Sequence, residues 1–451
     1  MHPPQGSNGK GERQMLKISA NARKAIEMLN NAGFEAYAVG GCVRDLIMGK
    51  EANDFDITTS AFPEETKKVF EKERTVETGI KHGTLTVLMD GEPLEITTYR
   101  IDGEYLDSRR PECVSFTRSL EEDLSRRDFT MNALVYNPTQ GVLDFFGGKD
   151  DIQNGIIRAI GEPEKRFKED ALRILRAIRF SSTLGFKIEE NTKRAMVKCK
   201  HLLHNISGER IAVEINKFVL GKNVKNAILE NYEILGELVP EFIKMYGFDQ
   251  KNKWHIYDVL EHTAVAVENT PCDLVLRLAM LFHDTGKVHT FFTDENGVGH
   301  FYEHGEKSAE IVRDYLNKYK YDNYTKHRVI WLVENHDVPT EERELIVKRR
   351  LNKMGKERFL ELLKIQRADK LAQSPALADI GHFTRLEQMV DSLSDQCFSL
   401  STLAVNGSDL VKLGYTGKRI GELLDILLNE VIDGKLPNEK DLLLERIKDI
   451  K

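Results

Sequence analysis

The sequence of 451 residues contains no run of about 18 apolar residues, which a helix needs to cross a membrane. Its polar beginning, MHPPQGSNGKGERQ, lacks the apolar centre of a secretory signal peptide. Internal repeats and low-complexity tracts are absent as well. These absences predict a cytoplasmic protein without membrane contact, and residues 1–15 are expected to form a disordered tail.

Cysteine is scarce too. The five cysteines are odd in number, scattered, and without the spacing of a metal site. Reduced thiols are therefore expected, as in cytoplasmic proteins. The net charge of −7 argues against nonspecific coating of a polyanion but leaves room for one local basic groove. The cysteines are Cys42, Cys113, Cys199, Cys272 and Cys397.

Strand patterns are confined to the first third of the chain. EAYAVGG, DFDITT, GTLTVLMDG and PLEITTYR alternate as strands do, and an Asp-Gly turn joins the last two as a hairpin. From about residue 162 the pattern is almost wholly helical. We therefore predict an α+β fold, in which a small mixed β-sheet head precedes a long all-α body. The predicted divisions are a head (16–155), a helical neck (156–245), a His-rich helical domain (250–375) and a helical tail domain (395–451).

Two aspartates, Asp54 and Asp56, lie one residue apart in a predicted strand. Side chains at such positions share a face of the sheet, where bare carboxylates repel each other unless a divalent cation joins them. Oxygen ligands suit Mg²⁺. Glu95, on a neighbouring predicted strand, would supply a third carboxylate. The residues alone leave open a turn or cap for the aspartates and a solvated strand position for Glu95.

A phosphate site is suggested just before these aspartates. Gly40 and Gly41 end a strand, and Arg44 follows in a short predicted helix. Glycines at this junction let backbone amides approach an anion, and the guanidinium adds a positive charge. A tight turn is the alternative reading.

The segment EDALRILRAIRF places four charged residues at intervals of three on a predicted helix. Its first two, Asp170 and Arg173, would form an acceptor beside a donor fork. Cytosine and adenine present the complementary edge, an amino donor beside a ring-nitrogen acceptor, whereas guanine and uracil present the reverse. The pair therefore predicts selection of C and A, with a surface salt bridge as the alternative. Arg176 and Arg179 complete the series.

Taken together, several motifs in unbroken order resemble the bacterial class II tRNA nucleotidyltransferases, the CCA-adding enzymes of the polymerase-β-like superfamily. They are GGCVRDLIMG, NDFDITTS, KHGTLTVLMDG, LEITTYR, SRRPECVSFTRSLEEDLSRRDFTMNAL, DFFGG and RFKEDALRILRAIRF. The resemblance implies that Asp54 and Asp56 hold two Mg²⁺ ions, with Glu95 as the third acid, and that tRNA, CTP and ATP are the partners. Poly(A) polymerases and A-adding enzymes share much of this pattern and remain alternatives.

The resemblance also assigns further residues. Arg127, Asp128 and Asn132 match positions that hold the nucleotide's ribose and phosphates, although the residues alone fit a helix cap with surface charge equally well. DGEYLDSRRPECVSF (102–116) matches a loop that helps one pocket accept C and then A. Residues expected to contact tRNA phosphates are Arg158, Lys165, Arg166 and Lys168 in the neck and Lys412, Lys418 and Arg419 in the tail.

The His-rich region resembles the HD phosphohydrolase superfamily, with His, His-Asp and Asp in that order on successive helices. This implies a transition metal held by His262, His283, Asp284 and Asp369. His304 and His336 would be available for a second metal. A degenerate domain kept for folding or tRNA contact is the alternative, and a metal phosphohydrolase with a nucleotide-binding head is the alternative function. The oligomeric state does not follow from the sequence.

Overall fold

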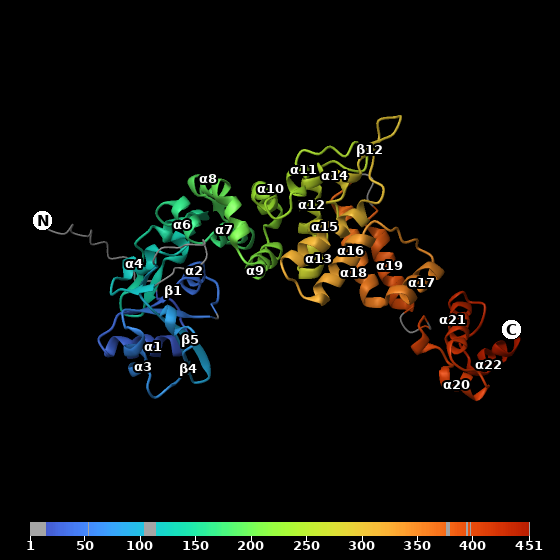
Figure 1. Cartoon of the computed structure of the whole chain (residues 1–451), viewed down its shortest axis with the longest axis horizontal. Coiled ribbons are helices and arrows are strands. Elements are labelled where there is room, and N and C mark those ends of the chain that lie inside the picture. The colour runs from blue at the N-terminus through green and yellow to red at the C-terminus, as the bar shows by residue number, and fades with distance from the viewer. Residues whose placement is uncertain are drawn as a thin grey trace. The chain divides into compact units, whose positions relative to one another are not determined.

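The computed structural model describes residues 15–52, 54–102, 114–375, 379–393, 396 and 398–450. These residues form two compact units, the first ending at Asn223 and the second beginning at Val224 (Figure 1). The boundary lies inside the predicted neck, so the finer division of the body stays a prediction. Within the described ranges, every helix is too short or too polar to span a lipid bilayer.

A mixed seven-stranded sheet forms the centre of the first unit, in the order β3-β4-β5-β2-β1-β8-β9. β2 and β5 run parallel, and the other neighbouring pairs run antiparallel. This sheet confirms the predicted α+β head. Its strands are β1 (Ala36–Val39), β2 (Asp56–Thr59), β3 (Arg74–Val76), β4 (Thr84–Met89), β5 (Glu92–Thr98), β8 (Val135–Asn137) and β9 (Gly141–Leu143).

The hairpin predicted from the Asp-Gly pair is confirmed between β4 and β5. Asp90 and Gly91 have φ angles of 49° and 85°, which suit the left-handed turn that joins two strands tightly. On β4, Leu85, Val87 and Met89 are buried while the residues between them are partly exposed. This alternation fixes which side chains of β5 face the core and which face away from it.

Helices pack on this sheet and extend the first unit beyond it. α1 packs on β1 and β2, and α3 packs on β4. Farther along, α7 and α9 pack together, and the Ser182 hydroxyl donates to the Phe218 carbonyl at 2.7 Å. The helices are α1 (Ala20–Asn31), α2 (Gly41–Ile47), α3 (Pro63–Val69), α4 (Leu120–Ser125), α5 (Gly148–Asn154), α6 (Pro163–Glu169), α7 (Leu172–Leu184), α8 (Glu190–Cys199) and α9 (Gly208–Val219). The minor elements are β6 (Arg100–Asp102), β7 (Val114–Phe116), β10 (Ile156–Ile157), β11 (Lys187–Ile188) and the 3₁₀ turns η1 (Ile80–His82), η2 (Thr130–Asn132) and η3 (Lys200–Asn205).

The second unit is helical, as predicted, apart from the short hairpin of β12 (Phe292–Thr293) and β13 (Gly299–His300). α12, α13, α15, α16 and α18 pack around a common core. Separate apolar clusters hold together α17 to α19 and the final helices. The helices are α10 (Val224–Leu235), α11 (Glu241–Met245), α12 (Val259–Asn269), α13 (Leu274–Phe282), α14 (Lys287–Thr290), α15 (His304–Lys318), α16 (Asn323–Asn335), α17 (Glu344–Met354), α18 (Lys356–Leu371), α19 (Gly381–Leu393), η4 (Leu400–Thr402), α20 (Gly407–Lys412), α21 (Lys418–Ile432) and α22 (Lys440–Asp449).

Candidate functional site

Three carboxylates gather where the parallel strands β2 and β5 meet. Asp56 opens β2 and lies directly opposite Glu95 on β5. Asp54 precedes the strand by two residues, and burial alternates from it onward, because Asp54 and Asp56 are exposed while Phe55 and Ile57 are buried. The side chains predicted to share a face therefore point away from the core together.

The electrostatics of Asp56 show how strongly this group needs positive charge. Although Asp56 reaches solvent, the protein around its carboxyl group displaces water and raises the pKa, and the charges of Glu95 and Asp54 raise the pKa further. The guanidinium of Arg127 acts in the opposite direction. Carboxylates that repel one another on a sheet edge are a donor set suited to a divalent cation, whose charge would remove the repulsion.

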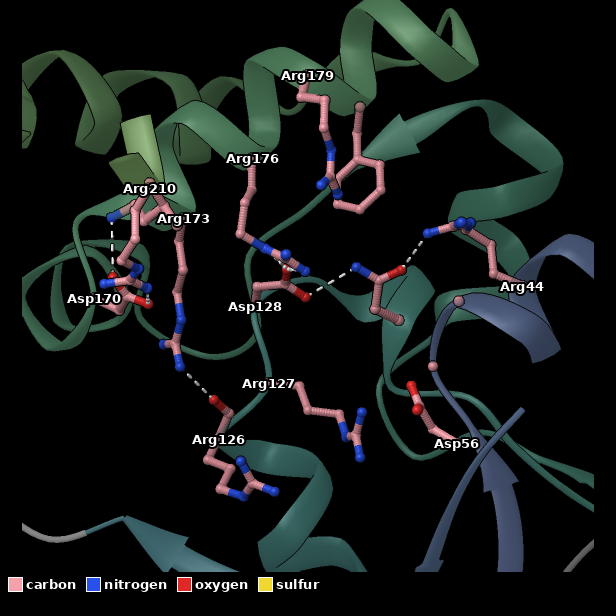
Figure 2. A pocket seen from close by; sticks show the side chains of 15 residues that line it. Arg44, Asp56, Arg126, Arg127, Asp128, Asp170, Arg173, Arg176, Arg179 and Arg210 are labelled. Carbon is pink, nitrogen blue, oxygen red and sulfur yellow. Dashed lines mark hydrogen bonds and ion pairs between the residues drawn. The ribbon is translucent and has the colours of Figure 1, made fainter. Parts of the chain in front are cut away.

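A cavity of about 430 Å³ opens beside Asp56. Seven arginines and three aspartates line it, which leaves an excess of positive charge suited to a polyanion such as a triphosphate. Figure 2 shows their side chains converging on the cavity from several elements, among them Asp56 of β2, Arg44 of α2 and Arg176 of α7. The lining residues are Gly40, Gly41, Arg44, Asp56, Arg126, Arg127, Asp128, Asn132, Asp170, Leu172, Arg173, Arg176, Arg179, Phe180 and Arg210.

Gly40 and Gly41 form the predicted junction between a strand and a short helix, since β1 ends at Val39 and α2 begins at Gly41. Gly40 has a φ of 83°, which residues other than glycine rarely adopt. A Cβ atom at Gly40 would stand 3.4 Å from Nη1 of Arg127. The glycine therefore keeps the wall of the cavity thin where a guanidinium approaches it.

A continuous chain of hydrogen bonds links α2 and the turn η2 of the head to α7. Arg44 Nη1 donates to Asn132 Oδ1 at 2.7 Å, and Asn132 Nδ2 donates to Asp128 Oδ1 at 2.9 Å. Arg176 Nε then donates to Asp128 Oδ2 at 2.7 Å. Burial raises the pKa of the Asp128 carboxyl, but the charges of Arg176 and Arg173 and the hydrogen bonds from Asn132 and Arg176 together lower this pKa to about 2. Four of the predicted nucleotide-binding residues, Arg44, Asn132, Asp128 and Arg176, are thus joined in one network (Figure 2).

One prediction about the base-reading segment is wrong. Asp170 does not lie on the helix with the three arginines, because α7 begins at Leu172 and Asp170 has an extended backbone with φ −143° and ψ 101°. Its Oδ1 instead accepts from the Leu172 amide at 3.1 Å, so the side chain caps the helix that it was expected to join. Arg173 and Arg176 do lie on α7, as predicted, and Arg179 follows them.

Asp170 and Arg173 both line the cavity, but each bonds to a different partner. Asp170 Oδ2 accepts from Arg210 Nη2 at 2.8 Å. Arg173 donates to Glu169 Oε2 at 2.9 Å and to the Arg126 carbonyl at 2.7 Å. The expected acceptor and donor therefore stand at the same wall and are held independently (Figure 2).

Sequence reasoning missed four residues of the cavity, Arg126, Leu172, Phe180 and Arg210. Arg210 lies 40 positions after Asp170 and showed no periodic signal. Phe180 was part of the apolar stripe of a helix, yet its ring lies 4.1 Å from the Arg179 guanidinium and 5.1 Å from that of Arg44. Arg126 could have been found, since it neighbours Arg127 in the same basic pair.

Several predicted RNA contacts already have protein partners. Arg158 pairs with Asp151 at 3.1 Å, and Arg166 pairs with Glu169 at 2.6 Å. Arg419 pairs with Glu422 at 3.2 Å. Their contact with RNA stays a prediction. In the predicted loop 102–116, residues 103–113 lie outside the described residues.

The six predicted residues of the His-rich region meet in one cluster, in which Asp369 is partly exposed and the other five are buried. His262 Nε2 lies 2.9 Å from Asp369 Oδ1 and 3.3 Å from Asp284 Oδ2. His283 Nε2 lies 3.2 Å from Asp284 Oδ2. On the other side of Asp284, Oδ1 lies 3.4 Å from His304 Nε2. His336 Nε2 lies 3.1 Å from His304 Nε2 and 3.8 Å from Asp284 Oδ1.

The four imidazoles of this cluster share one hydrogen-bonding pattern. Each Nδ1 lies 2.7 to 3.2 Å from a backbone carbonyl oxygen, which directs the Nε2 lone pairs toward the carboxylates. Metal-binding histidines are oriented in this way. The cluster contains two groups of three possible ligands that share Asp284, one with His262 and His283 and the other with His304 and His336. Within each group, the ligand atoms all lie within 4.8 Å of one another. The donor set therefore fits one or two metal ions of the kind that imidazole and carboxylate bind.

Three family models match the chain: "Poly A polymerase head domain" over residues 36–158, "Probable RNA and SrmB- binding site of polymerase A" over 185–245, and "tRNA nucleotidyltransferase domain 2 putative" over 301–447. The CCA-adding enzyme of Ligilactobacillus salivarius is 35% identical over 430 residues, which are 94% of each chain. The chain belongs to the CCA-adding enzyme family. This confirms the resemblance drawn from the head motifs.

Other members of the CCA-adding enzyme family support the assignment. The enzyme of Lactobacillus helveticus is 33% identical over 96% of this chain and 98% of its own. The crystal structure of the Bacillus stearothermophilus CCA-adding enzyme in complex with CTP matches with a TM-score of 0.71 and 31% identity, over 95% of this chain and 97% of that one. The likeness therefore covers both units, and the interpretation of the His cluster as an HD site stays a prediction.

Proposed function

We propose that this protein adds C, C and A to the 3′ end of tRNA from CTP and ATP. Both family membership and the chemistry of the site support this activity. The observation that carries it is the junction of three carboxylates with an arginine-lined cavity, where Asp56 belongs to both groups. Such a site would hold a triphosphate with its α-phosphorus beside the carboxylates. A tRNA substrate also favours a cytoplasmic localisation of the protein.

The residues present fit divalent cations, because Asp54, Asp56 and Glu95 offer oxygen donors whose mutual repulsion a cation would relieve. When bound, two Mg²⁺ ions supply the Lewis acidity that activates the RNA 3′-hydroxyl and stabilises the leaving pyrophosphate. The protein's own contribution is to hold the two reactants in line and to neutralise charge.

The arginines of the cavity bind the triphosphate, and their orientation does not change when pyrophosphate leaves. Asp128 holds Arg176, and Asn132 holds Arg44, so these guanidiniums are oriented before the nucleotide arrives. Preorganised charge of this kind lowers the reorganisation needed as pyrophosphate departs. At the far wall, Asp170 accepts from the amino group of C or A while Arg173 donates to the neighbouring ring nitrogen.

The test uses three tRNA transcripts, which lack CCA, end in C or end in CC. Each is incubated with CTP, ATP or both, and the product lengths are measured. Completion of CCA on all three transcripts is the expected result. Extension of the CC-ended transcript alone would identify an A-adding enzyme, and long A tails would identify a poly(A) polymerase.

A second activity, metal-dependent phosphate-ester hydrolysis, is favoured by the His cluster of the second unit. The specific observation is the alignment of four Nε2 atoms toward Asp284 and Asp369, with each Nδ1 bound to the backbone. Lys287 adds a cation 2.7 Å from Asp284 Oδ2 and would help to hold a substrate phosphate.

Metal content and hydrolysis are measured together to test this second activity. The purified protein is expected to contain a transition metal and to hydrolyse p-nitrophenyl phosphate or a cyclic nucleotide. His283→Ala should lose both properties, while Asp56→Ala should lose neither. A metal-free wild-type protein that stays inactive after loading with Mn²⁺, Co²⁺ or Ni²⁺ would identify the cluster as a degenerate site.

A further inference from the structure

Arg210 lies beside Asp170 in the cavity but outside the segment EDALRILRAIRF, which was expected to select the base. Arg210, in the first turn of α9, donates from Nη2 to Asp170 Oδ2 at 2.8 Å. Both side chains are mostly shielded from solvent, with 31% and 20% of their surface exposed. Arg210 also lines the same cavity as Asp170 and Arg173. Its position therefore couples α9 to the site of base selection.

Asp170 needs such a partner because its backbone does not belong to a helix. A single hydrogen bond, from the Leu172 amide to Oδ1, would leave the carboxylate free to rotate about its last torsion. The second bond, from Arg210 to Oδ2, fixes the plane of the carboxylate. Each oxygen keeps another lone pair, so an amino group of C or A can still be accepted.

Arg173 is fixed without help from Arg210. It donates to Glu169 and to the Arg126 carbonyl. Separate contacts thus orient Asp170, the acceptor of the base-reading pair, and Arg173, its donor. The relative orientation of the two side chains depends on both sets of contacts. Four residues after Arg210, α9 also supplies Glu214, which pairs with Arg179 at 3.1 Å. The same helix therefore contacts both Asp170 and Arg179, the first and last of the four charged residues spaced by three.

We infer that Arg210 is a positioning residue for nucleotide selection, which acts by orienting the Asp170 carboxylate. This inference rests on the proposed function. With Arg210 removed, the carboxylate turns away from the plane of the incoming base and the hydrogen bond to the amino group loses its alignment. Incorporation of C and A falls, and the rejection of U and G weakens because that rejection depends on an acceptor fixed opposite their carbonyls.

The experiment compares Arg210→Ala and Arg210→Lys with Lys217→Ala, which removes an exposed cation from the same helix. Single-nucleotide incorporation gives kcat/KM for CTP and UTP on tRNA lacking CCA, and for ATP and GTP on tRNA ending in CC. Arg210→Ala should lower the two discrimination ratios by at least about tenfold. Arg210→Lys should recover part of the loss, and Lys217→Ala should change neither ratio.

A double-mutant cycle separates positioning from a general structural role. Once Asp170→Ala is present, Arg210→Ala should change discrimination no further, because the group that it orients is gone. Unchanged ratios in Arg210→Ala, or equal additional losses in the two backgrounds, would overturn the inference. Such a result would leave the proposed function intact, since wild-type CCA addition and the effect of Asp170→Ala are measured in the same series.

Discussion

Arg176 donates from both Nε and Nη2 to one oxygen of Asp128, at 2.7 and 2.6 Å. The other oxygen of Asp128 accepts from Asn132 and from the Phe129 amide. This carboxylate is buried, and it joins α7, which carries Arg176, to the turn η2 of the head. The pair therefore contributes both to stability and to the geometry of the nucleotide site.

Asp128→Asn should destabilise the protein at neutral pH by roughly 2 kcal/mol, because it removes the ionised partner of Arg176. The pKa of the carboxyl falls from 3.8 to about 2 on folding. The stabilisation is therefore fully present above pH 3.8 and is lost as the pH falls through about 2. Urea unfolding at pH 7 and at pH 3 measures the difference between the two proteins. A difference that is as large at pH 3 as at pH 7 would contradict the ion-pair explanation.

Asp170→Ala should relax nucleotide selection toward U or G. Without the carboxylate, the site loses the acceptor that favours the amino groups of C and A, and discrimination should fall at least about tenfold. Competition assays with CTP and UTP on tRNA lacking CCA measure the change. Full activity with unchanged fidelity would show that other groups read the base.

Phe180→Leu should raise KM for CTP and ATP several-fold. The ring lies against three guanidiniums, those of Arg44, Arg176 and Arg179, and a smaller side chain leaves them less well oriented. The loss of stability should be only about 1 kcal/mol, since the volume changes little. Phe145→Leu is the control, because Phe145 is 45% exposed outside the cavity. Equal KM values for the two variants would show that Phe180 does not contribute to nucleotide binding.

Binding of tRNA should weaken strongly as salt increases, although the chain carries a net charge of −7. The slope of log K for tRNA binding against log salt concentration should be negative. If Lys418 and Arg419 both contact phosphate, replacing both by alanine should make this slope shallower by about one to two units. Filter binding from low to high salt measures the slope. Affinity that does not change with salt would contradict phosphate contacts.

Local patterns in the sequence were enough to predict β1, β2, β4 and β5, the Asp-Gly hairpin and the side shared by Asp54 and Asp56, because each depends on neighbouring residues. The strands β3, β8 and β9 of the same sheet were not predicted. The position of Asp170 was predicted wrongly. An Asp with intervals of three to later arginines resembles a helix face, yet its short side chain instead binds the Leu172 amide and caps the helix.

Contacts between distant residues were beyond the reach of the sequence. The bond from Arg210 to Asp170 depends on how α9 packs on α7, and no periodicity links positions so far apart. The His cluster was predicted because the resemblance supplied its order. The orientation of its rings depends on backbone carbonyls that side-chain identity does not reveal.

The central claim is that carboxylates at the junction of β2 and β5 hold the cations for nucleotide transfer. The most direct measurement is the rate of CMP incorporation by Asp56→Asn, with Asp90→Asn as a control that removes an equal charge from the exposed β4–β5 turn. We predict a loss of at least about a hundredfold for Asp56→Asn and wild-type speed for Asp90→Asn. Incorporation by Asp56→Asn at the wild-type rate would contradict the account.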